Sequence, residues 1–400
     1  MSAESFLPPS VLRLTDGQPF LAGPNPLDSS KLRITLTKCP KPVPALDDPD
    51  LISQKVFTDH MVWARWTASS GWDAPEIRPH GPLSLPPSAS VLHYATACFE
   101  GMKAYRGYDG KLRLFRPLYN CERMLASAAR AALPAFEPKQ LLELIRRLCA
   151  LEGPKWLPSD RKGSSLYIRP TLVGVDDNLG FRAPQEAVLF IIVSYWPDAK
   201  PSGQRLLASE SDTIRAWPGG SGSAKLAANY GPSILAHAQA KRKGYDQILW
   251  LFGADRQITE AGSTNIFVIW RTSNGRLQLV TPALDDHTIL AGLTRKSVLE
   301  LSRERLLDPA IQQDGVEPVE TLEQAITIHD VIRAADEGRL HSVFVVGTAA
   351  SIVPVREIRF YERTVQVDTS LSLHMTLLQQ WMDEIRYGVQ PSTWADVVEE

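Results

Sequence analysis

The sequence predicts an α/β protein in two unequal halves, and three observations support this prediction. The chain has 400 residues, 44% of them hydrophobic, which is enough for two buried cores. From about residue 56, short apolar runs typical of strands alternate with amphipathic stretches typical of helices. Residues 197–203 hold two prolines and a glycine, which indicates a linker. We therefore expect an extended arm over 1–50, a small α/β domain over 51–196 and a larger domain over 204–400.

The first half follows a proline-rich arm that includes Pro8, Pro24 and Pro44. Its helices are predicted by apolar residues at helical spacing, and its strands by short β-branched and aromatic runs beside turn residues. The expected elements are strands over 111–115, 165–173 and 187–193 and helices over 119–133 and 138–152.

The strands and helices of the second half are predicted from the same apolar patterns and turn residues. Asn274 and Gly275 form a two-residue hairpin signal between apolar runs. The expected elements are strands over 247–252, 265–270, 276–281 and 342–346 and helices over 292–305 and 370–387.

Composition argues against several classes of protein. The net charge is −2, so no basic surface for nucleic acid is implied. The longest apolar runs are far shorter than the roughly 20 residues that span a bilayer. The four cysteines and eight histidines show no metal-binding spacing, so we expect no metal and reduced thiols. A cytoplasmic protein fits best. A short mitochondrial presequence stays open, because the arm over residues 1–50 precedes the first alternation of strand-like and helix-like stretches.

Two segments indicate the chemistry. Lys225 and Tyr230 lie in the small-residue segment 219–231, and Glu260 follows in the strand-turn segment 257–267. In this order they predict a pyridoxal phosphate enzyme. The lysine would form a Schiff base, the tyrosine would bond the ring oxygen, and the carboxylate would keep the ring nitrogen protonated. Lys225 could also be an ordinary surface lysine after a flexible turn.

The glycine-rich segment does not match a phosphate-binding P-loop. Ala224 stands where that motif has a glycine, and Leu226 stands where it has a serine or threonine.

A phosphorylated cofactor needs an anion site, and the sequence holds two candidates. The amides of Leu293 and Thr294 open the helix expected from residue 292. Arg123 lies early in the helix expected over 119–133 and could make a bidentate contact with phosphate. A plain helix start and an exposed helical arginine would explain the same residues without a ligand.

Six motifs together resemble the branched-chain aminotransferase family of eukaryotic type, within the fold-type IV pyridoxal phosphate enzymes. They occur in order between residues 56 and 387, at 88–105, 114–117, 167–170, 219–231, 257–267 and 347–350. The resemblance implies a small N-terminal α/β domain and a larger C-terminal pseudo-barrel domain that binds the cofactor. It also implies amino acid and 2-keto acid substrates.

The resemblance assigns roles to individual residues. Lys225 would be the Schiff-base lysine and proton shuttle, with Tyr230 on the cofactor's phenolic oxygen and Glu260 on the pyridine nitrogen. The phosphate would be held by Arg123, the amides of Leu293 and Thr294, and Thr348. The substrate residues would be Tyr94 and Arg169 with the main chain of Thr348 and Ala349 for carboxylates, and Phe99, Tyr167 and Ser263 for the side chain. The loop of Phe181 would reach a neighbouring subunit's site, which implies a homodimer.

Several side-chain pocket positions depart from the family pattern. They are Ser53, Phe181, Ala199, Ser263 and Thr264. We expect a keto-acid range broadened or shifted toward larger chains, while an ordinary branched-chain preference stays open. Also open are a D-amino-acid or amine transaminase, an aminodeoxychorismate lyase, a dedicated biosynthetic aminotransferase and a silent binding protein. The replacement of a redox Cys-x-x-Cys by residues 350–353 excludes thiol switching there.

Overall fold

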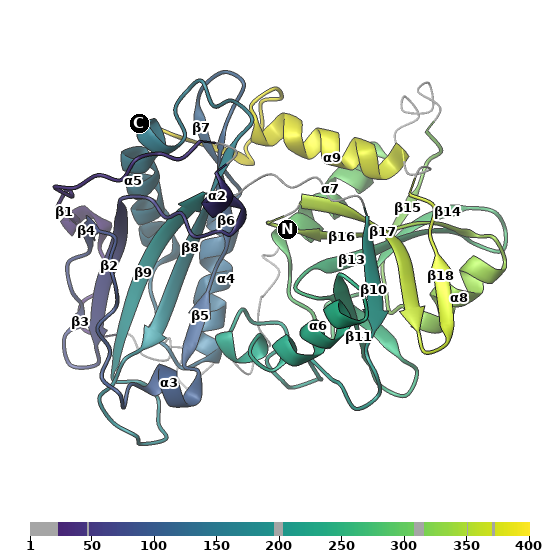
Figure 1. The fold of residues 1–400 in the computed structure, drawn as a ribbon, viewed down its shortest axis with the longest axis horizontal. Coiled ribbons are helices and arrows are strands. Elements are labelled where there is room, and N and C mark those ends of the chain that lie inside the picture. The colour runs from purple at the N-terminus through teal and green to yellow at the C-terminus, as the bar shows by residue number, and fades with distance from the viewer. Residues whose placement is uncertain (1–22, 46–47, 196–202, 308–315, 350, 370–372) are drawn as a thin grey trace. The chain divides into compact units, whose positions relative to one another are not determined.

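A computed structural model describes residues 23–45, 48–195, 203–307, 316–349, 351–369 and 373–400 (Figure 1). The chain divides into two compact units. Unit 1 comprises residues 1–198, 224–228 and 384–400, and unit 2 comprises residues 199–223 and 229–383. Of the expected linker over 197–203, only Gly203 lies within the described residues.

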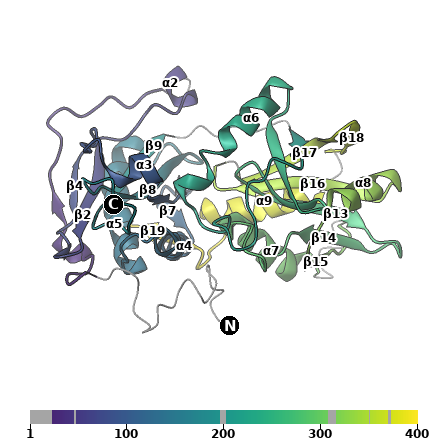
Figure 2. The same ribbon diagram turned by 90° about the horizontal axis from the view of Figure 1, so that it is seen from below.

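Unit 1 is built on a ten-stranded sheet. Its order is β1 (Arg33–Ile34), β4 (Glu76–Pro79), β2 (His60–Thr67), β9 (Glu186–Tyr195), β8 (Ser165–Gly174), β6 (Met102–Arg106), β7 (Leu112–Phe115) and β19 (Ala395–Val398), with β3 (Gly71–Trp72) on β2 and β5 (Ala97–Phe99) on β8. Strand β19, near the C-terminus, lies antiparallel beside β7 (Figure 2). Residues far apart in the sequence therefore share this sheet.

Helices α4 (Pro117–Arg130) and α5 (Pro138–Trp156) pack against this sheet in one apolar core. Each begins with a proline, which suits the first helical turn because its missing N–H has no partner there. The apolar stripe predicted for α5, which includes Leu141 and Leu148, is buried as expected. Helix α4 ends earlier than predicted, because Ala132 adopts left-handed backbone with φ of 52°. Short helices η1 (Ser29–Lys31), α2 (Pro49–Ile52) and α3 (Ser90–Tyr94) complete unit 1.

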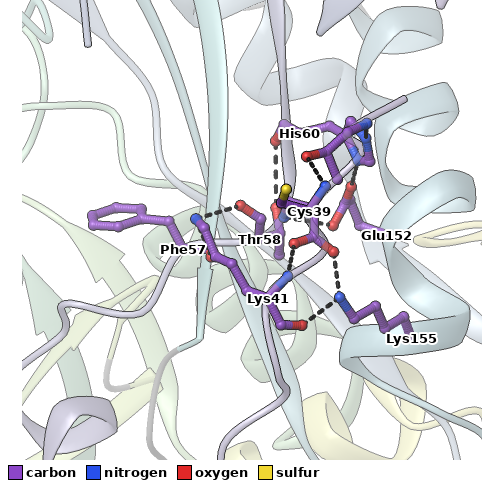
Figure 3. Close-up of polar contacts among 9 residues, drawn as sticks. Cys39, Lys41, Phe57, Thr58, His60, Glu152 and Lys155 are labelled. Carbon is purple, nitrogen blue, oxygen red and sulfur yellow. Dashed lines mark hydrogen bonds and ion pairs between the residues drawn. The ribbon is translucent and has the colours of Figure 1, made fainter. Parts of the chain in front are cut away.

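The described part of the N-terminal arm is held to unit 1 by polar contacts (Figure 3). The Thr37 N–H donates to Nε2 of His60 at 2.9 Å, and His60 Nδ1 lies 2.5 Å from the buried carboxylate of Glu152. Asp59 accepts from the Lys41 N–H at 2.7 Å and from Lys155 Nζ at 2.5 Å. These contacts fix residues 37–41 beside the start of β2 and the end of α5.

Unit 2 is built on a nine-stranded sheet. Its order is β12 (Gln257–Ala261), β11 (Gln247–Phe252), β10 (Gln204–Ala208), β17 (Ser351–Phe360), β16 (Leu340–Gly347), β13 (Asn265–Arg271), β14 (Leu277–Thr281) and β15 (Glu320–Glu323), with β18 (Arg363–Gln366) on β17. The predicted hairpin through Asn274 and Gly275 is confirmed, because β13 and β14 pair antiparallel with Val268 opposite Val280. The core of this unit combines branched residues of these strands with those of α8.

The helices of unit 2 are α6 (Ser233–Arg242), α7 (Leu293–Arg305) and α8 (Ile328–Asp336). A 3-10 turn, η2 (Ala227–Asn229), precedes α6, and α9 (Leu373–Arg386) follows the last strand of this unit. The helix predicted over 292–305 is confirmed as α7, with Gly292 as its N-cap. The helix predicted over 370–387 corresponds to α9, while residues 370–372 lie outside the described chain. Within the described residues, no helix combines the length and apolarity needed to cross a bilayer.

Candidate active site

Lys225 lies in a short extended segment that is fixed to β5 of unit 1. Leu226 forms an antiparallel bridge with Cys98, and the Phe99 N–H donates to the Lys225 carbonyl at 3.2 Å. The Lys225 N–H donates to Ser127 Oγ on α4 at 2.9 Å. The Lys225 ammonium lies 5.0 Å from the centre of the Phe99 ring. The backbone contacts and the half-buried position therefore argue against an ordinary lysine on a flexible turn.

Arg123 is buried, so the simpler explanation of an exposed helical arginine is wrong. Its side chain is 4% exposed and pairs with the fully buried carboxylate of Glu100. Nε donates to one carboxylate oxygen at 2.6 Å and Nη2 to the other at 2.8 Å. Asn120, one turn earlier in α4, also donates to Glu100 at 2.9 Å. This is a bidentate, charge-assisted pair of the strongest common kind.

The pKa of Glu100 reflects opposing effects. Burial raises the pKa of this carboxyl, but the charge and hydrogen bonds of Arg123, the charge of Lys225 and the amide of Asn120 outweigh it. The net pKa lies below the ordinary value, so Glu100 is ionised.

Arg169, Tyr167 and Phe99 form one cluster in unit 1. Tyr167 and Arg169 are two residues apart in β8 and therefore share a face of the sheet. Arg169 Nη2 donates to the Tyr167 hydroxyl at 3.0 Å, and its guanidinium lies 4.7 Å from the Phe99 ring centre. Its Nε is buried without a hydrogen-bond partner among the described residues. An unsatisfied guanidinium N–H beside two aromatic rings is suited to binding an anion.

Gly101 is required beside this cluster. A Cβ at residue 101 would lie 2.0 Å from the Tyr167 hydroxyl oxygen, so any side chain would displace that ring. Gly101, which lies within the motif at 88–105, therefore makes room for Tyr167.

Tyr94 and Phe181 are exposed side chains of unit 1 that contact each other. The rings meet edge to face at 5.5 Å, and the Tyr94 hydroxyl donates to the Leu179 carbonyl at 2.6 Å. Phe181 is 90% exposed and Leu179 is also exposed. Two residues predicted for different parts of the substrate site are thus brought into direct contact.

In unit 2, Glu260 is a buried carboxylate near the end of β12. One oxygen accepts from the Leu290 N–H at 2.9 Å and lies 3.4 Å from the Asn265 side-chain amide. The other oxygen lies 2.9 Å from Nη1 of the buried Arg215. This contact brings the charges together without hydrogen-bond geometry. Glu260 is therefore fixed at one oxygen and faces a cation at the other.

Helix α7 presents an uncapped N-terminus near Glu260. Gly292 is the N-cap, and no side chain among the described residues caps this helix. A Cβ at residue 292 would lie 2.0 Å from Asn265 Oδ1, so the close approach requires glycine. The amides of Leu293 and Thr294, both buried, open the helix, and such amides favour a bound anion.

The remaining predicted residues of unit 2 lie at loops and in a cavity. Thr348 and Ala349 follow β16 and are half-buried and exposed, respectively. Tyr230 and Ser263 line a cavity of about 280 Å³ together with Arg215. A larger cavity of about 820 Å³ in the same unit is lined by none of the predicted site residues.

Glu100 and Arg215 are the charged partners that sequence reasoning did not select. Glu100 lies within the motif at 88–105, directly after the predicted substrate residue Phe99. Its place in that motif could have indicated a role in the site. Arg215 stands ten residues before Lys225 in a segment without helical or strand periodicity, which gives no signal.

Histidine, cysteine and carboxylate side chains are the candidates for metal or thiol chemistry. Within the described residues, no group of three or more histidine, cysteine or carboxylate side chains could hold a metal. Burial raises the pKa of the Cys98, Cys121 and Cys149 thiols, which keeps them protonated, while Cys39 is exposed.

Comparison with known proteins identifies the family. Residues 97–358 match the amino-transferase class IV family. The chain is 40% identical to the mitochondrial branched-chain-amino-acid aminotransferase of Schizosaccharomyces pombe over 98% of this chain and 90% of that protein. It is 43% identical to the cytosolic branched-chain-amino-acid aminotransferase of Saccharomyces cerevisiae over 93% of this chain and 98% of that protein.

Solved structures share the fold. The branched-chain amino acid aminotransferase of Escherichia coli aligns with a TM-score of 0.65 at 22% identity, covering 85% of this chain and 99% of that one. The branched-chain aminotransferase of the archaeon Thermoproteus uzoniensis, solved with norvaline, aligns with a TM-score of 0.63 at 23% identity over 84% and 99% of the two chains. The expected fold-type IV architecture is thereby confirmed. The chain belongs to the class IV aminotransferases, and nearly its whole length is shared with branched-chain members of that family.

Proposed function

We propose that this protein is a pyridoxal phosphate-dependent aminotransferase that exchanges amino groups between L-branched-chain or related hydrophobic amino acids and 2-oxoglutarate. The observation that carries the proposal is the presence of both an anchored lysine, Lys225, and a buried carboxylate, Glu260, in a chain of this family. When bound, the cofactor carries the amino group and withdraws electrons from the substrate carbon.

The residues present fit such a cofactor. Its phosphate is an anion, and buried Arg123 and the uncapped amides of α7 are anion donors. Its ring nitrogen needs a carboxylate, and Glu260 is held in a fixed orientation by the Leu290 amide. Thr348 would add a phosphate contact, and Tyr230 would bond the ring hydroxyl.

Lys225 performs the covalent and proton-transfer work in this proposal. Its amine would hold the cofactor covalently and, when free, would act as the base that takes a proton from the amino-bearing carbon of the substrate and as the acid that returns one. The anchored backbone of residues 224–228 limits where the amine can reach, because the chain is fixed at three points.

Substrate binding is proposed to use two charged or polar groups and an apolar wall. Arg169 and Tyr94 would position the substrate carboxylates, assisted by the main chain of Thr348 and Ala349. Arg169 suits this role since its Nε is buried and available for an anion. Phe99, Tyr167 and Ser263 would line the side-chain slot.

We further propose a homodimer in which the loop of Phe181 reaches the partner's site. The exposed position of Phe181, in edge-to-face contact with Tyr94, supports this, because aromatic residues are enriched at interfaces. The full-length chain run on a sizing column with light scattering tests it, and a monomer at micromolar concentration would contradict it.

A substrate panel tests the proposed function. Purified protein with pyridoxal phosphate should turn over 2-keto acids with L-glutamate as donor. It should also absorb at visible wavelengths in the cofactor band. We expect activity with the branched-chain keto acids and with larger chains, because four of the five pocket replacements are smaller or more polar.

Each different outcome of the panel points to a different activity. Rejection of larger chains would indicate an ordinary branched-chain preference. Turnover with D-amino acids or amines, or lyase activity on aminodeoxychorismate, would identify another fold-type IV specificity. A protein that binds no cofactor would be a silent relative. We propose a cytoplasmic location, although the named relatives include mitochondrial and cytosolic proteins, and imaging of the tagged full-length chain tests it.

A further inference from the structure

Glu100 is a fully buried carboxylate that has no role in the proposed function so far. It follows β5 directly, and its backbone N–H donates to the Pro170 carbonyl at 2.9 Å. Its two oxygens accept from Arg123 twice, from Asn120 and from the Gly101 N–H at 3.1 Å. A buried charge with this many donors is held in one position.

The donors come from one face of helix α4. Asn120 and Arg123 are three residues apart, so their side chains project from the same side of the helix. Because Glu100 takes both Nε and Nη2 of Arg123, the plane of the guanidinium and the direction of Nη1 are set by this one carboxylate.

Glu100 also lies next to the Lys225 segment, because the residue before it, Phe99, donates its N–H to the Lys225 carbonyl at 3.2 Å. Both Arg123 and Lys225 lower the pKa of this carboxyl against the opposing effect of burial. Among the described residues, the thiols of Cys98 on β5 and Cys121 on α4 also respond to the charge of Glu100. Burial first, and the charge of Glu100 second, raise their pKa values, so both stay protonated. One anion therefore stands among two cations and neutral thiols.

We propose that Glu100 is a positioning residue for cofactor binding. It orients the guanidinium of Arg123 toward the cofactor phosphate, and its negative charge favours the protonated form of the bond between Lys225 and the cofactor. This inference rests on the proposed function, since it assigns a support to Arg123 and Lys225 in that role.

The experiment distinguishes this positioning role from the opposite one, in which Glu100 competes with the cofactor phosphate for Arg123. A carboxylate that occupies an arginine can compete with phosphate for the same donors. In that case, removing the charge of Glu100 would tighten cofactor binding rather than weaken it.

The experiment compares two substitutions with a matched control. Glu100→Gln keeps the shape and removes the charge, whereas Glu100→Asp keeps the charge and shortens the reach. Glu152→Gln is the control, because Glu152 is another buried, paired carboxylate of unit 1 that contacts His60 and the Asp59 N–H. Each holoenzyme is dialysed against pyridoxal phosphate to obtain its Kd. The visible absorbance of the lysine-bound cofactor is then titrated with pH.

For Glu100→Gln we expect the Kd for pyridoxal phosphate to rise by about 10- to 100-fold. The pH midpoint of the absorbance change should fall by about one unit, because a negative charge near the protonated bond is lost. Glu100→Asp should weaken binding while leaving the midpoint in place. Glu152→Gln should lower the melting temperature and change neither the Kd nor the midpoint.

Three results would overturn the inference. Glu100→Gln that binds the cofactor as tightly as the unaltered protein, or more tightly, contradicts the positioning role. If that variant does not fold, Glu100→Asp with an unchanged Kd does the same. A Glu152→Gln control that matches Glu100→Gln in both readouts would reduce the effect to lost stability. Failure of the unaltered protein to retain pyridoxal phosphate would instead remove the proposed function.

Discussion

The two units each hold a buried pair of opposite charges, but the pairs are arranged in opposite senses. In unit 1 the residue expected to meet the cofactor is the cation Arg123, and the carboxylate of Glu100 lies behind it. In unit 2 the expected cofactor residue is the carboxylate Glu260, and the cation Arg215 is its partner. Each functional charge is therefore accompanied by an opposite charge from its own unit.

The geometry of the two pairs differs, and so do their expected roles. The pair in unit 1 is bidentate at 2.6 and 2.8 Å, which fixes a planar group in orientation. The pair in unit 2 is a single contact at 2.9 Å, and the orientation of Glu260 comes from the Leu290 amide instead. Rigid support in unit 1 thus depends on a side chain, whereas in unit 2 it depends on the backbone. Replacing a member of the Arg123–Glu100 pair should therefore lower the melting temperature more than replacing a member of the Arg215–Glu260 pair.

The largest effect is expected at Lys225, which lies beside the pair of unit 1. Lys225→Ala should retain the fold, because the segment is anchored through backbone atoms that alanine keeps. Turnover should fall by more than about 10³-fold, since both the covalent bond and the proton transfer are lost. Steady-state kinetics and circular dichroism measure the two properties, and a variant with a substantial fraction of normal turnover would show that another group acts as nucleophile.

Glu260→Gln tests the pair of unit 2. Turnover should fall by about 10²-fold, because the charge that keeps the ring nitrogen protonated is removed. The cofactor content should change far less, since glutamine can still accept from the Leu290 amide. Equal activity of the two proteins would remove Glu260 from the site.

Arg215→Met serves as the companion variant for Glu260→Gln. It leaves the carboxylate in place and removes its partner cation, so a smaller loss of turnover is expected. A loss larger than that of Glu260→Gln would mean that Arg215 itself contacts the cofactor or substrate.

Arg123→Ala tests the pair of unit 1 and should have two consequences. Loss of a charge-assisted phosphate contact should raise the Kd for the cofactor by about 10- to 100-fold. The melting temperature should also fall, because Glu100 is left as a buried charge without its cation. Dialysis and thermal melts separate these effects. Unchanged cofactor retention would leave phosphate binding to the amides of Leu293 and Thr294.

Much of this fold could be predicted from sequence because its signals are local. Strand β11 has the predicted bounds, since its apolar run stops at Gly253, whose φ is 77°. The hairpin of β13 and β14 followed from two turn residues. The buried stripe of α5 followed from helical spacing. In each case the residues that decide the structure are neighbours in the chain.

The pairing of side chains could not be predicted in the same way. Glu100 and Arg123 are 23 residues apart and meet because β5 packs beside α4, a tertiary contact that no periodicity encodes. Arg215 and Glu260 are joined across a longer stretch that includes an irregular loop. The resemblance named the residues expected to touch the cofactor, but their supporting charges emerged only from the packed structure.

The smallest expected effect concerns stability at Asp59, whose carboxylate accepts from the Lys41 N–H of the N-terminal arm and from Lys155. Burial raises the pKa of Asp59, but Lys155 and the Lys41 amide outweigh it, so the pKa lies below its ordinary value. Such a group stabilises the fold above its unfolded pKa of about 3.9, and this stabilisation is lost as the pH falls through the lower folded value. At neutral pH, Asp59→Asn should lower the melting temperature by about 1–3 °C. The difference from the unaltered protein should shrink below about pH 4. A difference that stays constant from neutral to acidic pH would show that the ionised carboxylate contributes nothing to holding the arm.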